Sequence, residues 1–224
     1  ANIGDLDGDG VNDLAVGASH YDAGDKTSRG ALFIMLMNIE GTVKETFDHD
    51  TITNGLELGD DDYFGRSVAN IGDLDGDGVN DLAVGAIRDD MDENGDATEI
   101  NATNRGAVHI MFMNIDGTVK DSSVEINDYT TDGPVLENND QFGSSVANLG
   151  DLDGDGVNDL AVGAYGDDAG CTDCGAVHIM FMNIDGSVKS TAEINQTTTN
   201  GPGGLSDANP LEAKDVFGSS VANI

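Results

Sequence analysis

Residues 1–18 read ANIGDLDGDGVNDLAVGA, and nearly the same words return at 69–86 and at 147–164. Two shorter motifs recur with the same spacing as this stretch. An FG-x-S-V-A segment precedes the second and third copies and ends the chain, and a GALFIMLM or GAVHIMFM segment follows each copy. Three phrases that recur in a fixed order indicate a tandem repeat, and the repeat decides the fold.

Each phrase predicts β structure. DLAVGA is a short apolar run that ends at glycine, and AVHIMFM is a longer run followed by NIDG, a tight-turn sequence. Runs that are apolar on both faces, such as IMFM, favour a central strand between neighbouring sheets. Together with FG-x-S-V-A and the strand after the turn, these runs give about four strands per unit. The sequence therefore predicts an all-β fold of three tandem four-stranded antiparallel blades of the β-propeller type.

The repeat boundaries predict blade 1 at 1–63, lacking its first strand, blade 2 at 64–141 and blade 3 at 142–216. Residues 217–224 are then the first strand of a following blade. Propellers typically close with four to eight blades, so these three are not expected to close as a monomer. Two explanations of the ends stay open. The array continues in adjoining repeats of a longer chain, or the last strand is donated head to tail to a neighbouring copy, giving a fibril or a ring.

Composition limits the partners. The 224 residues include 43 Asp and Glu against 9 Lys and Arg, a formal net charge of −34. Such a charge repels nucleic acid and anionic membranes and attracts cations. There is no apolar run of about 18 residues, so no membrane insertion is expected. A metal ion is the small partner that the composition favours.

The acidic phrase carries the chemistry. In D-x-D-G-D-G-x-x-D, carboxylates stand at loop positions 1, 3, 5 and 9, and the carbonyl of position 7 can join them to give five oxygen donors where Ca²⁺ takes six to eight. A flexible oxygen-rich loop favours Ca²⁺ over Mg²⁺, which demands a tight octahedron. Position 12 is valine in place of the glutamate of an EF-hand, so this is a calcium loop of another kind.

The alternative is that the Asp-Gly clusters are merely solvated turns, but their identical offsets in three copies favour three calcium sites. The predicted ligands are Asp5, Asp7, Asp9, Val11 and Asp13; Asp73, Asp75, Asp77, Val79 and Asp81; and Asp151, Asp153, Asp155, Val157 and Asp159.

The phrase FGxSVANxGDLDGDGxNDLAVGA followed by GAVHIM resembles the FG-GAP repeat, the blade unit of integrin α-subunit propellers and of many microbial surface proteins. The resemblance implies four-stranded antiparallel blades with Ca²⁺ in the loop that joins the first two strands, which maps onto the three aspartate sets. It also implies an extracellular setting and an adhesive or structural role. The proline of the family motif is replaced here by Ser19, Ile87 and Tyr165.

No zinc-protease, nucleophile-elbow or phosphate-loop motif is present, so we predict a protein that is not an enzyme. The favoured function is an extracellular or cell-surface structural or adhesive protein that assembles head to tail with copies of itself or with adjoining repeats. The alternative is a ligand-binding fragment of a larger integrin-like propeller, with a protein or glycan as ligand.

Three smaller features of the sequence also lead to expectations. Cys171 and Cys174 are expected to form a local disulfide in an oxidising exterior, with free thiols as the alternative. Asn101 and Asn195 match the N-glycosylation pattern. The histidines of the two AVHIM segments stand where the first unit has Phe33, which indicates strand packing.

Overall fold

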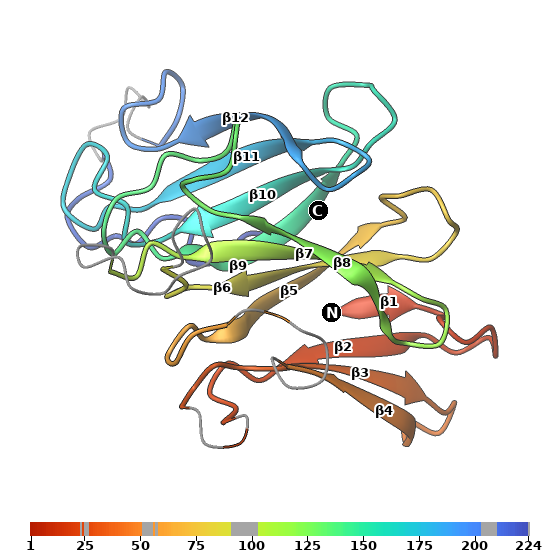
Figure 1. Cartoon of the computed structure of the whole chain (residues 1–224). Coiled ribbons are helices and arrows are strands. Elements are labelled where there is room, and N and C mark those ends of the chain that lie inside the picture. Colours follow the sequence, from red (N-terminus) through yellow and green to blue (C-terminus); the bar gives the residue numbers. More distant parts are fainter. Residues whose placement is uncertain are drawn as a thin grey trace.

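The computed structural model describes residues 1–22, 24, 27–50, 56, 58–90, 103–202 and 210–223, and only the backbone of residues 121 and 122. The described residues form twelve β-strands and no helix (Figure 1). The strands are β1 (Asn2–Gly4), β2 (Asp13–Gly17), β3 (Leu32–Met37) and β4 (Val43–His49); β5 (Phe64–Gly72), β6 (Asp81–Ala86), β7 (Ala107–Met113) and β8 (Val119–Ile126); and β9 (Phe142–Gly150), β10 (Asp159–Ala164), β11 (Ala176–Met182) and β12 (Val188–Ile194).

Each blade is a four-stranded antiparallel meander in which neighbouring strands follow one another in the chain. The third and fourth strands are joined by the NIDG turn. In blade 2 the N–H of Asn114 donates to the carbonyl of Thr118 at 2.8 Å, and Gly117 adopts a φ of 85°, which suits glycine. The prediction of three four-stranded antiparallel blades is confirmed, and none of these sheets closes on itself.

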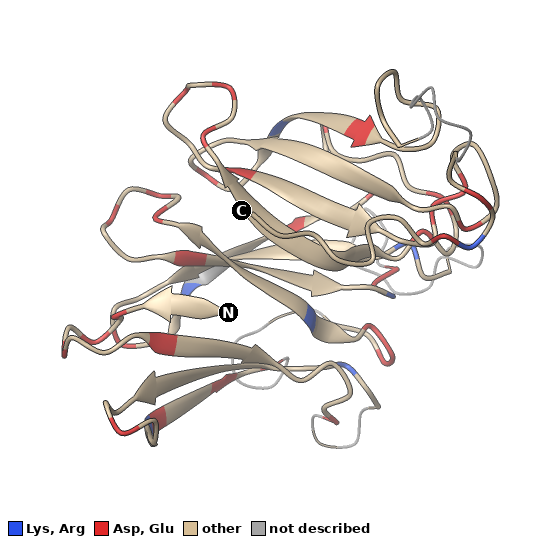
Figure 2. Ribbon diagram, turned by 180° about the vertical axis from the view of Figure 1, so that it is seen from behind, with Lys and Arg blue, Asp and Glu red and all other residues tan. Residues whose placement is uncertain are grey.

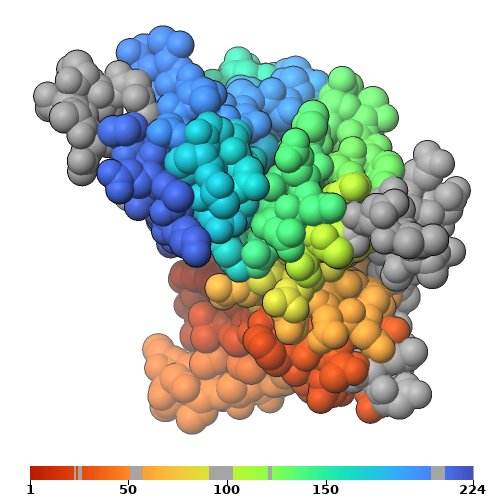
Figure 3. All heavy atoms as spheres, turned by 90° about the vertical axis from the view of Figure 1, so that its left-hand side faces the viewer, coloured from red at the N-terminus to blue at the C-terminus, as the bar shows by residue number. Residues whose placement is uncertain are grey.

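Blade 2 packs between the other two blades, as the order of colours in Figure 3 shows. Side chains on its inner strands alternate between two hydrophobic cores. Val84 and Met111 belong to the core shared with blade 1, whereas Ala83 and Ile110 belong to the core shared with blade 3. Every residue of β7 is buried, which confirms that the apolar run AVHIMFM lies between two neighbouring sheets.

The joint between blades depends on a close approach of two glycines. A Cβ atom on Gly85 of β6 would lie 2.0 Å from the carbonyl oxygen of Gly143 in the next blade, so no other residue fits there. Gly17 meets Gly65 in the same way, and so does Gly163 with Gly218. The repeated glycines of the FG and VGA phrases are therefore paired across every joint.

The two ends of the chain differ from the sequence-based expectation. Blade 1 was expected to lack its first strand, but β1 pairs with β2 over Asn2 and Gly4, because three residues of the ANIG phrase suffice for two register pairs. Residues 217–223 form turns without a strand, since no second strand of a following blade lies beside them in the described chain.

Residues 217 and 218 nevertheless dock on blade 3 as the start of a blade does. The N–H of Phe217 donates to the carbonyl of Cys174 at 2.8 Å, and its counterpart Phe142 donates to the carbonyl of Arg105 at 2.9 Å. Ser145 Oγ donates to the carbonyl of Gly218 at 2.8 Å, just as Ser67 Oγ donates to that of Gly143 at 2.8 Å. The tail thus reproduces the joint between blades.

The outer face of blade 1 is open. Leu14 and Val16 of β2 are 37% and 40% exposed, whereas their counterparts Leu82 and Val84 in β6 are fully buried against blade 1. An apolar surface that a preceding blade covers elsewhere is therefore bare at this end. Because the described residues contain no helix, they also contain no apolar helix long enough to span a bilayer.

Candidate metal centres

The three acidic loops join the first strand of each blade to the second. They project from the same side of the molecule, on the right in Figure 1 and on the left in Figure 2, where Asp and Glu residues mark each turn. The glycines at positions 4 and 6 of each loop have positive φ, for example 79° at Gly76 and 94° at Gly78. This backbone lets the loop curl upon itself.

The last aspartate of each loop is an anchor. In blade 2 the buried carboxylate of Asp81 accepts hydrogen bonds from the N–H groups of Leu74 at 2.8 Å and Met113 at 2.9 Å. Asp13 and Asp159 make the same pair of bonds in their blades. Burial raises the pKa of Asp81, opposed by these two bonds. The anchor ties the acidic loop to the end of the third strand.

The aspartates at loop positions 1 and 3 shape the loop around a common point. Asp73 accepts the N–H groups of Asp77 and Gly78 at 2.9 and 2.8 Å, and Asp75 accepts that of Asp77 at 3.2 Å. Blades 1 and 3 repeat these three bonds. The backbone of the loop therefore holds two further carboxylates close to the buried anchor.

Three of the four predicted carboxylates of each loop come together. One ligand oxygen from each lies within 4.8 Å of the others, in the groups Asp5, Asp7 and Asp13; Asp73, Asp75 and Asp81; and Asp151, Asp153 and Asp159. The position-5 aspartates, Asp9, Asp77 and Asp155, lie outside these groups, although each is tied to the position-7 valine of its loop through that valine's N–H.

A lysine that the sequence reading missed faces each loop from the fourth strand. Lys120 Nζ of β8 pairs with Asp75 and, at 2.8 Å, with Asp77. Lys189 lies 2.6 and 2.8 Å from Asp153 and Asp155, and Lys44 lies 2.5 and 3.1 Å from Asp7 and Asp9. The recurrence of the lysine in TVK and SVK was the available signal.

These lysines compensate part of the loop charge. The hydrogen bond to Asp7 is the main cause that raises the pKa of Lys44 to about 12, and the bond from Lys189 lowers the pKa of Asp155. One ammonium against four carboxylates still leaves each loop strongly negative. Three converging oxygens that lack a nitrogen or sulfur donor suit a hard divalent cation, so each acidic group can hold a metal.

The other predicted sites lie elsewhere. The structure joins Cys171 and Cys174 by a disulfide in the loop between β10 and β11. Asn195 is 8% exposed; its side-chain amide donates to Glu193 and its carbonyl accepts the N–H of Thr197 at 2.7 Å, so a glycan there requires this turn to open. Asn101 lies outside the described residues.

Comparison with known proteins agrees with the repeat structure. The family model for the FG-GAP repeat matches residues 2–35, 64–111 and 142–180. Among curated proteins, the chain is 36% identical over 170 residues to integrin alpha-5 of Xenopus laevis and 32% identical over 165 residues to integrin alpha-PS5 of Drosophila melanogaster. These alignments cover 73% and 74% of this chain and 14% of each relative, so the chain spans about a seventh of their length.

Proposed function

The chain belongs to the FG-GAP repeat family, and from this we propose that it is a non-enzymatic, calcium-binding array of propeller blades with an adhesive or structural role outside the cell. The observation that carries the proposal is the recurrence of one cluster, two partly or fully exposed aspartates beside a buried aspartate, at the same place in all three blades. The similarity to integrin α chains supports adhesion at the cell surface.

We propose Ca²⁺ as the ion, at three sites. The carboxylates of positions 1, 3 and 9 supply the first oxygens in each loop, and the position-5 carboxylate with the position-7 carbonyl completes a five-oxygen set after a small movement of the loop. Water fills the remaining positions of the six to eight that Ca²⁺ prefers. Because the buried aspartate also holds the third strand, a bound ion stiffens three strands of the blade at once.

We further propose that the array continues beyond its two ends. The open face of blade 1 is of the kind that a preceding blade covers at the inner joints, and the docked tail at 217–223 is placed like the start of a following blade. The two ends therefore complement each other. Adjoining repeats of a longer chain, or further copies in head-to-tail order, would cover the open face of blade 1 and continue the blade that the tail begins. A fibril follows where the rotation from copy to copy does not close a ring.

A second candidate is recognition of a protein or glycan by a larger integrin-like propeller of which these blades form part. The similarity to integrin α chains favours it.

Calorimetric titration of the chelated full chain with Ca²⁺ tests the metal proposal. We expect one ion per acidic loop and a rise in the thermal midpoint on binding. An ion at a hundred times its Kd stabilises a fold by about 2.7 kcal/mol per site. Mg²⁺ at equal concentration is the control and should do less. A midpoint that ignores both chelator and Ca²⁺ contradicts structural calcium sites.

A further inference from the structure

A second group of potential ligands lies at the other end of the blades. In blade 3 the side chain of His178 is 2% exposed, and its Nε2 is a buried polar atom without a hydrogen-bond partner among the described residues. A buried polar atom of this kind costs free energy unless something pairs with it. His178 of β11 stands directly opposite Glu193 of β12 in the register, and the charge of Glu193 acts on the ring.

Glu193 lines a cavity of about 160 Å³ together with Asp140 and Asp167. Both aspartates are buried, and the residues that line the cavity include no Lys or Arg. This volume is several times the roughly 30 Å³ that one water molecule occupies in the liquid, so an ion with bound water fits. The cavity thus combines buried negative charge with room for an ion, and His178 stands opposite Glu193, one of the residues that line it.

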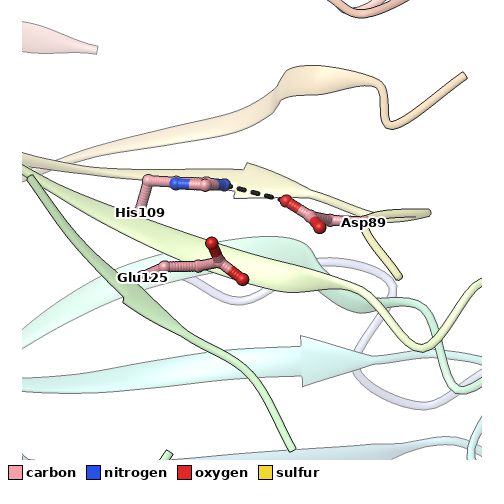
Figure 4. Close-up of side chains that lie close together, drawn as sticks. All are labelled: Asp89, His109 and Glu125. Carbon is pink, nitrogen blue, oxygen red and sulfur yellow. Dashed lines mark hydrogen bonds and ion pairs between the residues drawn. The ribbon is translucent and has the colours of Figure 1, made fainter. Parts of the chain in front are cut away.

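Blade 2 holds the equivalent residues closer together. Ligand atoms of Asp89, His109 and Glu125 lie within 4.8 Å of one another, whereas those of Asp167, His178 and Glu193 in blade 3 do not all lie within that distance. The Nε2 of His109 is 3.1 Å from Asp89 Oδ2. In Figure 4 the ring of His109 points toward Asp89, which follows β6, with the carboxylate of Glu125 beside them. Two atoms that bind one tetrahedral Zn²⁺ at about 2.1 Å lie roughly 3.4 Å apart, close to this separation.

Blade 1 lacks the constellation. Phe33 occupies the histidine position opposite Asp48, and Tyr21 occupies the position of Asp89. The two rings make an edge-to-face contact with centroids 5.6 Å apart. An aromatic pair therefore fills this place when the histidine and aspartate are absent, which shows that the fold of the blade does not require them.

We propose that blades 2 and 3 each bind a divalent transition-metal ion of the Zn²⁺ class through one histidine and two carboxylates: Asp89, His109 and Glu125 in blade 2, and Asp167, His178 and Glu193 in blade 3. A nitrogen donor among carboxylates selects Zn²⁺ over Ca²⁺ and Mg²⁺, whose ligands are oxygens. Three protein ligands leave a fourth position for water. These sites are distinct from the acidic loops, because Asp89 follows the end of β6 and Asp81 begins it.

A buried carboxylate with a raised pKa lies near each group. Burial, with a further contribution from Asp89, raises the pKa of Asp62 to about 8, and burial raises the pKa of its counterpart Asp140 to about 7. A cation at the ligand atoms offsets the mutual repulsion that these buried carboxylates otherwise experience.

Titration of the full chain with Zn²⁺, in excess Ca²⁺ to fill the acidic loops, tests the proposal. Calorimetry should show one equivalent for each of blades 2 and 3, and Co²⁺ in place of Zn²⁺ should give visible absorption bands of nitrogen and oxygen coordination. His109→Phe and His178→Phe, which copy blade 1, should each remove one equivalent. His20→Gln, at an exposed histidine outside both groups, is the control and should remove none.

Two further variants guard against a folding defect. Glu125→Gln and Glu193→Gln keep the shape of the side chain and should weaken Zn²⁺ at one site by about tenfold or more. Imidazole ¹⁵N shifts of His109 and His178 should move on addition of Zn²⁺ in the wild-type chain. Full Zn²⁺ uptake by the double histidine variant, or unmoved shifts, overturns the proposal. Ca²⁺ uptake in the same samples reports separately on the acidic loops.

Discussion

Asp81 begins β6 and Met113 ends the antiparallel strand β7 beside it, and the N–H of Met113 donates to the buried Oδ1 of Asp81 at 2.9 Å. The other oxygen of Asp81 accepts the N–H of Leu74. One carboxylate thus connects the acidic loop, the start of β6 and the end of β7. The aspartate that the sequence marks as a ligand is also a structural link when no metal is considered.

Asp81→Asn should destabilise the protein in the absence of metal. An amide offers one oxygen and one NH₂ group, so one of the two backbone N–H groups loses its acceptor, which costs about 1–3 kcal/mol. Chemical denaturation in chelator measures the free energy of unfolding. Glu40→Gln removes the same charge at an exposed turn and should change it little. Equal effects of the two variants contradict the anchoring role.

Lys120→Gln should make the second loop bind Ca²⁺ more tightly. The ammonium of Lys120 holds Asp75 and Asp77, two of the carboxylates that we assign to calcium, and so competes with the ion. Ion pairs near the protein surface are worth about 0.2–1 kcal/mol, which corresponds to a gain of up to about fivefold. The same variant should lower the stability of the metal-free chain, because the loop then lacks its counter-charge.

Calorimetry on Lys120→Gln and on Lys214→Gln checks this prediction, since Lys214 is exposed and lies outside the acidic loops. Weaker calcium binding in Lys120→Gln means that the lysine assists the metal.

Gly85→Ala should disrupt the joint between blades 2 and 3. Its Cβ would lie 2.0 Å from the carbonyl oxygen of Gly143, and backbone cannot retreat as a flexible side chain can. Overpacking in a core costs typically about 1–3 kcal/mol and sometimes more, and a backbone clash belongs at the upper end. Limited proteolysis and thermal melting report the loss. Gly41→Asn, in a turn with nothing near its Cβ, should behave almost as wild type.

Leu14→Glu together with Val16→Glu should abolish head-to-tail association of purified chains, as should removal of residues 217–224. Both changes act on the blade ends that we assign to continuation. Sedimentation velocity over a range of concentrations measures the association. Ile39→Glu, at a turn residue that is 83% exposed, is the control. A wild-type chain that stays monomeric throughout contradicts assembly from copies and leaves adjoining repeats as the continuation.

Local sequence was sufficient for most of the fold. β7 shows why, because its uninterrupted apolar run requires cover on both faces and the structure buries all of it. The first strand of blade 1 was missed because three residues carry too little pattern to predict a strand. The tail was expected as a strand because it repeats the FG-x-S-V-A motif. A strand also requires a neighbouring strand to pair with, and the motif alone does not supply one.

The candidate sites likewise divide into those that local sequence predicts and those that depend on tertiary structure. The acidic loops are contiguous in sequence, so their spacing indicated that carboxylates converge there; three of the four predicted in each loop do, and the position-5 aspartates lie outside the groups. Lys120 and the group of Asp89, His109 and Glu125 come from separate strands, and their meeting depends on the register between β7 and β8. Register is a tertiary property that no window of sequence contains, which is why the histidines read as packing residues.

The bare outer face of blade 1 bears on how the array comes apart. Among the described residues, each of the two hydrophobic cores joins blade 2 to one neighbour, so the middle blade is held from both sides whereas an end blade is held from one. Thermal opening should therefore begin at an end and travel inward in blade-sized steps. In a longer array a larger share of the blades would be held from both sides, and the rate at which the two end blades open would set how long the array stays folded.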